Sequence, residues 1–218
     1  MNTSGGPESV AARRREYDGG VLDVADLAPS WHEQLGRWLA EAAAAEMFEP
    51  NAMVLSTADA QGRPSSRTVL MRGFGPEGLT FFTNYGSRKG TEIEQNPNVS
   101  ALLSWLPLYR QVIVCGRAAK VDHAESAAYF HGRPRGSQLA SFVSPQSTVL
   151  PDRGTLAAMW AQADAEHPGD VPMRDNWGGY RVVPETVEFW QGQPMRMHDR
   201  LRFRRADTDR WVVERLAP

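Results

Sequence analysis

Three side chains that could bind an anion or a polar ring occupy every second position near the end of the sequence. In the stretch FWQGQPMRMHDRLRF these are Arg196, His198 and Arg200. Because side chains of an extended chain alternate between two faces, this spacing predicts that all three point to one side. The methionines between them, Met195 and Met197, should then point into apolar packing. The polar outer face of an edge strand would show the same alternation, so the pattern alone leaves both interpretations open.

Arginines elsewhere indicate two anion sites. Arg67 and Arg72 lie on one predicted strand, and their odd separation sends them to opposite faces if the strand is regular. They could then serve two different anions. Arg88 and Lys89 follow Gly86 and Ser87 at the start of a predicted helix. Free N–H groups and the positive end of the helix dipole favour a phosphate at such a position.

A second group of donors lies in the stretch YFHGRPRGSQ. Arg133 and Arg135 are close there to Tyr129 and Ser137, so guanidinium, phenol and hydroxyl donors combine as in phosphate recognition. Each arginine taken singly could be a solvated surface charge. Together they have no matching acidic run beside them, so the residues predict two phosphate-sized anion sites without naming the ligands.

Two other motifs are rejected as ligand sites. GFGPEG, residues 73–78, has the glycine spacing of a dinucleotide-binding loop, but that loop needs a helix after it. Here the strand-like LTFFTN follows, so we interpret the motif as a hairpin turn. HEQLG, residues 32–36, lacks the second histidine of a zinc helix, and the five histidines show no ligand spacing. No metal is therefore predicted.

These residues must be positioned by antiparallel strands with helices around them. Ser30 stands three positions before Glu33, a capping-box spacing that predicts a helix. Its buried face should comprise Trp31, Leu35, Trp38, Leu39 and Ala42. Segments rich in β-branched and aromatic residues, separated by turn residues, predict strands within 52–58, 66–72, 79–85, 99–106, 111–121, 179–184, 186–192, 199–205 and 210–216. Further helices are predicted at 87–95, 123–131 and 153–166. The class is α+β: an antiparallel, Greek-key-like barrel with surrounding helices.

Composition excludes several classes of protein. The 218 residues contain 24 Lys plus Arg and 26 Asp plus Glu, which argues against a bulk nucleic-acid or membrane-surface binder. The single cysteine, Cys115, permits neither a disulfide framework nor a cysteine-based zinc site within the chain. No apolar stretch reaches the ~20 residues of a membrane span, and the N-terminus lacks the apolar core of a signal peptide. We expect a soluble cytoplasmic protein with a disordered tail at 1–12 and a single domain at 13–218.

A series of short motifs runs in order from Arg14 to Pro218: RREY, PNAMVLST, RTVLMR, FFTNYGSRKG, RQVIVCG, YFHGRPRGSQ, SPQS, WGGYRV, EFWQG, RMHDR and RLAP. Together they closely resemble the pyridoxine (pyridoxamine) 5′-phosphate oxidase family. The resemblance implies an FMN-binding split β-barrel and a homodimer with FMN at the subunit interface.

The resemblance also implies which residues meet each ligand. For FMN these are Arg67, Thr68, Val69, Leu70, Met71, Arg72, Phe82, Thr83, Arg88, Lys89, Gln111, Gln146, Ser147, Trp190 and Arg200. For a phosphorylated pyridine substrate they are Arg14, Tyr17, Arg72, Tyr129, Arg133, Ser137, Arg196 and His198. Arg14 and Tyr17 would form a lid over the substrate. Arg196 and His198 would contact the pyridine, and they are the implied catalytic residues.

The implied reaction is oxidation of pyridoxine 5′-phosphate and pyridoxamine 5′-phosphate to pyridoxal 5′-phosphate by molecular oxygen, which yields hydrogen peroxide. Two positions depart from the family pattern: Arg72 replaces a usual lysine, and Glu49 stands near a usual aspartate. A related flavin oxidase of phenazine biosynthesis also varies at position 72, so an oxidase of that secondary-metabolite type is one alternative. It resembles this chain less well, since it lacks the YFHGRPRGSQ cluster and the RREY lid. A non-catalytic flavin- or pyridoxal-phosphate-binding barrel is the other alternative.

Overall fold

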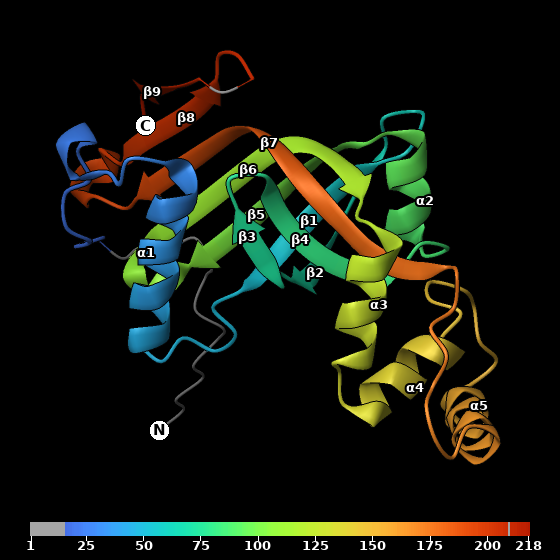
Figure 1. Cartoon of the computed structure of the whole chain (residues 1–218). Helices are drawn as coiled ribbons and strands as arrows, with labels where there is room; N and C mark the ends of the chain where they lie inside the picture. The colour runs from blue at the N-terminus through green and yellow to red at the C-terminus, as the bar shows by residue number, and fades with distance from the viewer. Residues whose placement is uncertain (1–15, 209) are drawn as a thin grey trace, which may run out of the picture.

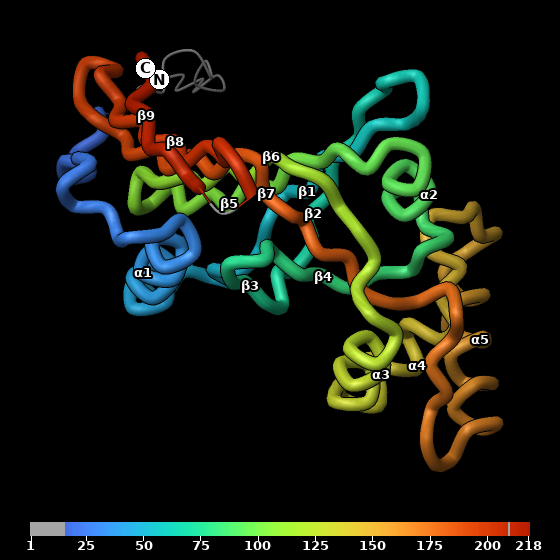
Figure 2. Tube along the Cα trace, turned by 45° about the horizontal axis from the view of Figure 1, so that its top comes forward, coloured from blue at the N-terminus to red at the C-terminus, as the bar shows by residue number. Residues whose placement is uncertain are grey.

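The structure is a computed structural model that describes residues 16–208 and 210–218, so Arg14 and the predicted tail lie outside the described residues. Its centre is an antiparallel sheet in the order β2-β1-β5-β6-β7-β4-β3. These strands are β1 (Ala52–Ala58), β2 (Pro64–Leu70), β3 (Gly73–Gly75), β4 (Gly78–Asn84), β5 (Asn98–Trp105), β6 (Arg110–Lys120) and β7 (Trp177–Gln191). β8 (Asp199–Arg205) pairs with β7, and β9 (Trp211–Arg215) pairs with β8. The sheet curls until β2 and β4 come into contact, as Figures 1 and 2 show.

Helices lie at both ends of this curled sheet. α1 (Trp31–Ala44) lies at one end, and α3 (His123–His131), α4 (Arg135–Val143) and α5 (Arg153–Glu166) lie together at the other (Figures 1 and 2). α2 (Arg88–Gln95) follows β4 directly. Short 3-10 turns occur at η2 (Val24–Asp26), η3 (Leu106–Leu108) and η4 (Pro194–Arg196). The predicted α+β class is confirmed.

Alternating residues of the strands build the core of the half-barrel. In β1, Met53 and Leu55 are fully buried, while Val54 between them faces outward. Leu103 of β5 and Val112 of β6 continue this buried layer. Each such side chain contributes roughly 1.5–3 kcal/mol when it leaves water, so the alternation fixes which face of each strand points inward and which faces remain for a site.

β7 is a single strand of 15 residues where the sequence patterns predict two. The register of the β6–β7 pair shifts between Cys115 and Gly116, which leaves Glu185 as a bulge next to Pro184. A proline cannot donate to the ladder and is tolerated at a bulge, so Pro184 bends the strand without ending it. β7 pairs with β4 through its first half and with β8 through its second half. It therefore joins two separate parts of the sheet that carry predicted site residues.

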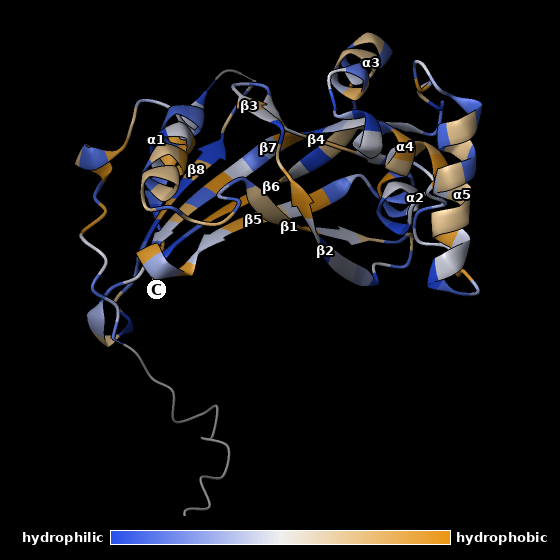
Figure 3. Ribbon diagram, turned by 90° about the horizontal axis from the view of Figure 1, so that it is seen from below, coloured by the Kyte–Doolittle hydropathy of each residue, from blue (hydrophilic) through white to orange (hydrophobic). Residues whose placement is uncertain are grey.

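Ser30 caps α1 as the capping-box spacing predicts. Its Oγ accepts a hydrogen bond from Glu33 N over 3.3 Å and donates to the Glu33 carboxylate over 2.7 Å. The helix has hydrophobic and hydrophilic residues side by side in Figure 3. Of its predicted inner face, Trp31, Leu35, Trp38 and Ala42 are buried and Leu39 is half-buried. The Trp38 ring packs edge-on against Phe189 of β7, with centroids 5.2 Å apart.

The sequence patterns do not predict α4, although they predict α3 and α5 with their observed bounds. α4 begins directly after Pro134, whose fixed φ suits the start of a helix. Its buried residues Leu139 and Val143 join Phe130 of α3 and Ala163 of α5 in a second, smaller core. A Gly- and Pro-containing stretch thus becomes helical because it can bury an apolar face against two neighbouring helices.

GFGPEG forms the turn of the β3–β4 hairpin, as the sequence predicts. Gly75 pairs with Gly78, and the next element is the strand β4. Gly78 has a φ of 139°, and a Cβ there would lie 2.1 Å from the carbonyl oxygen of Val182. A glycine is required at this position by both backbone geometry and space, which explains the motif without a nucleotide.

Within residues 16–208 and 210–218, no helix combines the length and apolar character needed to cross a membrane. The same residues contain no group of three or more His, Cys, Asp or Glu side chains that could hold a metal ion.

Candidate functional site

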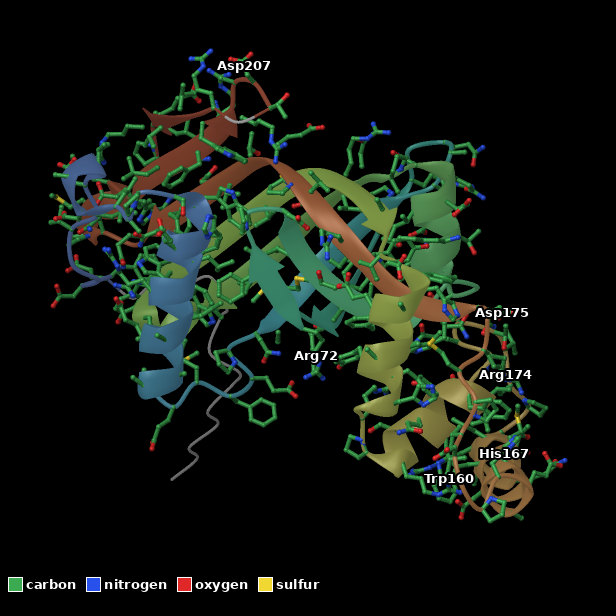
Figure 4. The ribbon with its side chains drawn as sticks, viewed as in Figure 1. Arg72, Trp160, His167, Arg174, Asp175 and Asp207 are labelled. Atoms are coloured by element: carbon green, nitrogen blue, oxygen red, sulfur yellow. The ribbon has the colours of Figure 1, made fainter. Side chains whose placement is uncertain are left out.

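A cavity of about 1040 Å³ opens between β2, β4, the start of α2 and the α3–α4 region. It brings together many of the predicted ligand contacts: Arg67, Thr68, Val69, Leu70, Arg72, Phe82, Thr83, Arg88, Lys89, Tyr129, Arg133, Ser137, Gln146 and Ser147. Met71, between two of these residues, instead points into the core and is 4% exposed. Figure 4 shows Arg72 projecting from the sheet on the side where α3 and α4 lie.

Arg67 and Arg72 both line this one cavity. Opposite faces are predicted only for a regular strand, and the chain does not continue as a regular strand from Arg67 to Arg72. β2 ends at Leu70, so the alternation of a regular strand does not extend to Arg72. The backbone N–H of Arg72 instead donates to Thr80 of β4 over 2.8 Å, which turns the chain toward the hairpin and the side chain toward the cavity.

At one end of the cavity, a cationic cluster surrounds a single buried carboxylate, that of Glu92 on α2. Arg88 Nε donates to Glu92 Oε1 over 2.8 Å, and Arg67 Nη2 lies 3.3 Å from Glu92 Oε2. Burial alone would raise the pKa of Glu92. Hydrogen bonds from Ser65, Thr57 and Arg88, together with the charge of Arg88, outweigh burial and lower that pKa to about 2. Glu92 is thus ionised throughout the physiological range.

Lys89, in the first turn of α2, completes this cluster. The side chain is buried, and its Nζ donates to Thr83 over 3.0 Å, to Ser87 over 3.2 Å and to Gln146 over 2.9 Å. Burial first, and then repulsion by Arg67, lower the pKa of Lys89 to about 8. A nearby anion would favour the charged form of the Lys89 ammonium group, so this side chain is suited to bind an anion.

A second cationic group lies at the α3–α4 side of the cavity. Arg133 Nη1 donates to Ser141 over 2.7 Å, and its guanidinium lies over the ring of Trp177 at 5.1 Å. Burial lowers the pKa of Arg133, an effect that Tyr129 opposes and that the charge of Arg72 strengthens. Arg72, Tyr129 and Ser137 line the same cavity as Arg133. Three of its members, Arg133, Tyr129 and Ser137, are among the residues that the sequence predicts for a second anion site.

Three aromatic rings that stack on one another also line the cavity. Phe82 of β4 stacks on Tyr129 of α3 with centroids 3.9 Å apart, and the planes of Tyr129 and Trp177 differ by 1°. No ligand role is predicted for Trp177 from the sequence. The local sequence offers one indication of a ring cluster: Trp177 directly precedes Gly178 and Gly179. The absence of side chains at these two glycines leaves space for neighbouring rings.

Arg135 belongs to the framework and not to the anion group. Its guanidinium donates to the backbone carbonyls of Gly169 and His167, beyond the last turn of α5, and to the Asp164 carboxylate over 2.6 Å. Arg135 does not line the cavity. Its position beside Arg133 in the sequence suggests an anion-binding role, but in α4 the Arg135 side chain points toward the end of α5.

A second set of predicted residues forms a row across three strands, outside the lining of this cavity. Gln111 of β6 pairs with Trp190 of β7, and Trp190 pairs with Arg200 of β8. Directly paired residues share a face of the sheet, so the three side chains lie side by side. Tyr17 and His198 pack on Trp190, with ring centroids 5.9 and 4.6 Å from it. The row is thus an aromatic and polar surface near the end of β7.

The predicted alternation of Arg196, His198 and Arg200 along one strand is wrong. Residues 194–196 form the turn η4, in which Met195 and Arg196 have φ values of 53° and 63°, and β8 begins only at Asp199. Met195 and Met197 are 81% and 65% exposed in this chain, and they are not in apolar packing. The turn after Pro194 breaks the extended run.

Arg200 also has an acidic partner that its sequence neighbourhood does not reveal. Its Nε and Nη2 donate to the two carboxylate oxygens of Glu188 over 2.7 and 3.0 Å. Glu188 lies on β7, and only the β7–β8 register brings it beside Arg200.

Comparison with known proteins gives this arrangement a family. Residues 39–166 match the family described as pyridoxamine 5′-phosphate oxidase, and residues 177–218 match the pyridoxine 5′-phosphate oxidase C-terminal dimerisation region. The chain is 51% identical over its full length to the pyridoxine/pyridoxamine 5′-phosphate oxidase of Salinispora arenicola, which is also fully covered. The chain belongs to the pyridoxamine 5′-phosphate oxidase family.

Two solved structures confirm the split-barrel fold of this family. The crystal structure of PhzG from Burkholderia lata, in complex with tetrahydrophenazine-1-carboxylic acid, is similar with a TM-score of 0.85 and 34% identity, covering 91% of this chain and 98% of that one. A pyridoxamine 5′-phosphate oxidase-related, FMN-binding protein from Nostoc punctiforme is similar with a TM-score of 0.69 and 21% identity, covering 88% and 99%. The second comparison concerns the fold alone.

Family membership also accounts for the location of the second row. The dimerisation region spans β7, β8 and β9, and it includes Trp190, His198 and Arg200. This match supports a homodimer. These three residues, which do not line the cavity of their own chain, thus lie in the region through which two chains of this family associate.

Proposed function

We propose that this chain is an FMN-dependent oxidase that converts pyridoxine 5′-phosphate and pyridoxamine 5′-phosphate to pyridoxal 5′-phosphate, with O₂ as electron acceptor and H₂O₂ as second product. The observation that carries the proposal is the presence of two cationic groups in one cavity, at α2 and at α3–α4. Two phosphorylated ligands need two such groups. A cavity of about 1040 Å³ also lies at the upper end of the usual size for ligand sites.

The cofactor is FMN, and the α2 cluster fits its phosphate. Arg67, Arg88 and Lys89 bring three positive charges and Glu92 brings one negative charge. Their balance complements a phosphate monoester, which carries about −1.5 to −2 charges at pH 7. When bound, FMN supplies the hydride acceptor and passes the electrons to oxygen.

The α3–α4 group binds the substrate phosphate. Arg72, which follows β2, and Arg133, which lies between α3 and α4, present two guanidinium groups to the cavity, and Tyr129 and Ser137 add hydroxyl donors. A planar guanidinium can donate two parallel hydrogen bonds to one phosphate, so arginine at position 72 keeps the binding role. The group fixes the ring of the substrate at a set distance from the α2 cluster, which is the positioning that a hydride transfer needs.

The row near the end of β7 comes from the partner subunit. Gln111, Trp190 and Arg200 contact the flavin across the dimer interface, while Arg196 and His198 contact the pyridine. Tyr17, which packs on His198 with centroids 5.6 Å apart, covers the substrate and excludes water. One hydride leaves C4′ of the substrate and one proton leaves its hydroxyl or amino group. The alcohol thereby becomes the aldehyde, and the amine becomes an imine that water hydrolyses to the aldehyde and ammonia.

Peroxide formation with matched substrates tests the proposal. We expect H₂O₂ from both pyridoxine 5′-phosphate and pyridoxamine 5′-phosphate, and a far higher KM for unphosphorylated pyridoxine, because the Arg72–Arg133 group then has no phosphate to bind. A protein that binds FMN but neither forms peroxide nor reduces its flavin anaerobically with these compounds would instead be a non-catalytic binding protein.

A phenazine-type oxidase is the second candidate function, because the Burkholderia lata structure is so similar in fold and is 34% identical. Its ligand has a carboxylate and no phosphate. The discriminating substrate is therefore tetrahydrophenazine-1-carboxylic acid, assayed beside the two pyridine phosphates. Faster turnover of the phenazine compound would assign the chain to that activity.

A further inference from the structure

The carboxylate of Glu92 is the centre of the α2 cluster. It accepts from Ser65 Oγ over 2.5 Å, from Arg88 Nε over 2.8 Å and from the hydroxyl of Thr57, and its side chain is 6% exposed. A buried charge of this kind costs free energy unless it is paired. Here every close neighbour is a donor, so Glu92 is fully compensated before any ligand arrives.

Glu92 also fixes the orientation of Arg67. The Arg67 guanidinium donates from Nη1 to the Leu55 carbonyl over 3.1 Å and to Thr57 over 2.6 Å, and from Nη2 to Ser65 and to Glu92. Thr57 and Ser65 in turn donate to Glu92. The carboxylate therefore anchors the two hydroxyl groups as well as the arginine. Acceptors at both Nη1 and Nη2 then hold the guanidinium in one orientation.

Arg88 is held differently. Its side chain is 62% exposed, and among the described residues it donates only through Nε, to Glu92. The two terminal nitrogens remain available to a ligand in the cavity that Arg88 lines. One carboxylate thus orients two arginines of different exposure, which come from β2 and from α2.

We propose that Glu92 is a positioning residue for the phosphate of the cofactor: it holds Arg67 and Arg88 in the orientation that binds this phosphate. The inference rests on the proposed function, because it takes FMN as the ligand of the α2 cluster. It extends that function to a residue that does not line the cavity and would itself repel the phosphate.

This repulsion makes the proposal testable through the sign of an effect. If Glu92 only balanced charge, Glu92→Gln would remove a negative charge near the phosphate and FMN would bind more tightly. If Glu92 positions the arginines, the same substitution frees them and FMN binds more weakly, although the net positive charge has increased. The glutamine keeps the volume of the side chain and can still accept from Thr57 and Ser65.

The measurement is the dissociation constant of the FMN-free protein for FMN and for riboflavin, which has the same ring system without the phosphate. For E92Q we expect the FMN constant to rise by about tenfold or more, equivalent to about 1.4 kcal/mol, and the riboflavin constant to change by less than about twofold. The matched control is Glu94→Gln, two positions along α2, where the carboxylate is 70% exposed and pairs with Lys120 over 3.4 Å. Glu94→Gln should leave both constants unchanged.

A double-substitution test shows whether Glu92 acts through Arg67. In an Arg67→Ala background, Glu92→Gln should weaken FMN binding by a smaller factor than it does in the wild type. If E92Q does not fold, Ser65→Ala decides in its place, since it removes one anchor of the same network; it should weaken FMN binding in the same direction by a smaller factor.

Three outcomes would overturn the inference: tighter FMN binding by E92Q, equal losses for FMN and riboflavin, or equal losses in the wild-type and Arg67→Ala backgrounds. Equal losses for the two flavins would indicate a merely structural role. Failure of the proposed function looks different, because the wild-type protein itself would then bind riboflavin as tightly as FMN, or bind neither.

Discussion

Lys89 and Gln146 meet at the cavity, where Lys89 Nζ donates to Gln146 Oε1 over 2.9 Å although 57 positions separate them in the chain. Lys89 comes from the first turn of α2, and Gln146 comes from the loop after α4. The contact ties the loop after α4 to α2 at the proposed site of the FMN phosphate. It also keeps the ammonium group buried, and this has a consequence for pH dependence.

The affinity for FMN should fall as the pH rises through about 8. Burial and the nearby Arg67 lower the pKa of Lys89 to about 8 in the FMN-free protein, and only the charged form attracts a phosphate. The bound phosphate raises that pKa again, so binding takes up a proton above pH 8 and weakens by up to about tenfold per pH unit. Titration of the FMN-free protein between pH 7 and 9.5, followed by flavin fluorescence, measures this. Lys89→Arg stays charged over the range and should bind with nearly constant affinity. A wild-type affinity that is flat to pH 9.5 would contradict the role of Lys89.

Arg72→Ala should mainly raise KM. A hydrogen bond to a charged group is worth roughly 1.5–3 kcal/mol, so the loss of the Arg72 fork should raise KM for pyridoxine 5′-phosphate about 10- to 150-fold. Arg72→Lys should keep substantial activity, since it retains the charge. Steady-state kinetics check this, with Arg117→Ala as a control, because Arg117 is exposed on β6 and does not line the cavity. An unchanged KM for R72A would remove Arg72 from the substrate site.

Arg135→Ala should lower stability and leave substrate binding intact. The guanidinium satisfies carbonyls beyond the end of α5 and pairs with Asp164. Loss of these partly exposed hydrogen bonds should cost about 1–2 kcal/mol, which corresponds to a fall in Tm of about 2–8 °C for a chain of this size. Thermal unfolding and KM should be measured on the same sample. A large rise in KM with an unchanged Tm would instead return Arg135 to the phosphate site.

Features that depend on a few neighbouring residues could be predicted from the sequence. The Ser30–Glu33 cap and the bounds of α3 and α5 are of this kind, because caps and helical periodicity are local. The hairpin at GFGPEG was also predictable, since the residues after it have strand character. That cationic side chains gather at more than one place could be expected, because the arginines cluster along the chain.

Features that depend on strand register or on a turn could not be predicted in this way. Arg200 meets Glu188 only because β7 and β8 pair in one particular register. Arg196 leaves the expected row because η4 takes a positive φ at two residues after Pro194. β2 ends between Arg67 and Arg72, so the alternation of a regular strand does not determine where Arg72 points. In each of these cases a turn, a strand end or a strand register decides where the side chain points. Alternation along the sequence does not reveal these features.

Substitutions near the end of β7 should show which residues position the substrate and which bind FMN. Arg196→Met should lower kcat/KM by about two orders of magnitude or more, about 2.7 kcal/mol, while FMN remains bound, because Arg196 positions the pyridine. His198→Asn should have a smaller effect, since a hydrogen-bonding group remains. Arg200→Met should first weaken FMN binding. Flavin content and anaerobic reduction by substrate distinguish these outcomes. If R196M reduces its flavin as fast as the wild type, Arg196 does not belong to the site.

The strongest prediction concerns the origin of the two halves of the site. Arg72 and Arg133 line the cavity, whereas Trp190 and His198 lie on a separate surface within the matched dimerisation region. If each active site takes the cavity from one subunit and the row from its partner, Arg133→Ala and Arg196→Met homodimers should each be nearly inactive. When the two variants are unfolded together and refolded, half of the dimers should contain one of each chain. Each of these mixed dimers has one site with both substitutions and one site with neither, so activity should return to about a quarter of the wild-type value. Refolding each variant alone is the control and should restore nothing. A mixture that stays as inactive as its components, although mass spectrometry shows mixed dimers, would mean that each chain completes its own site.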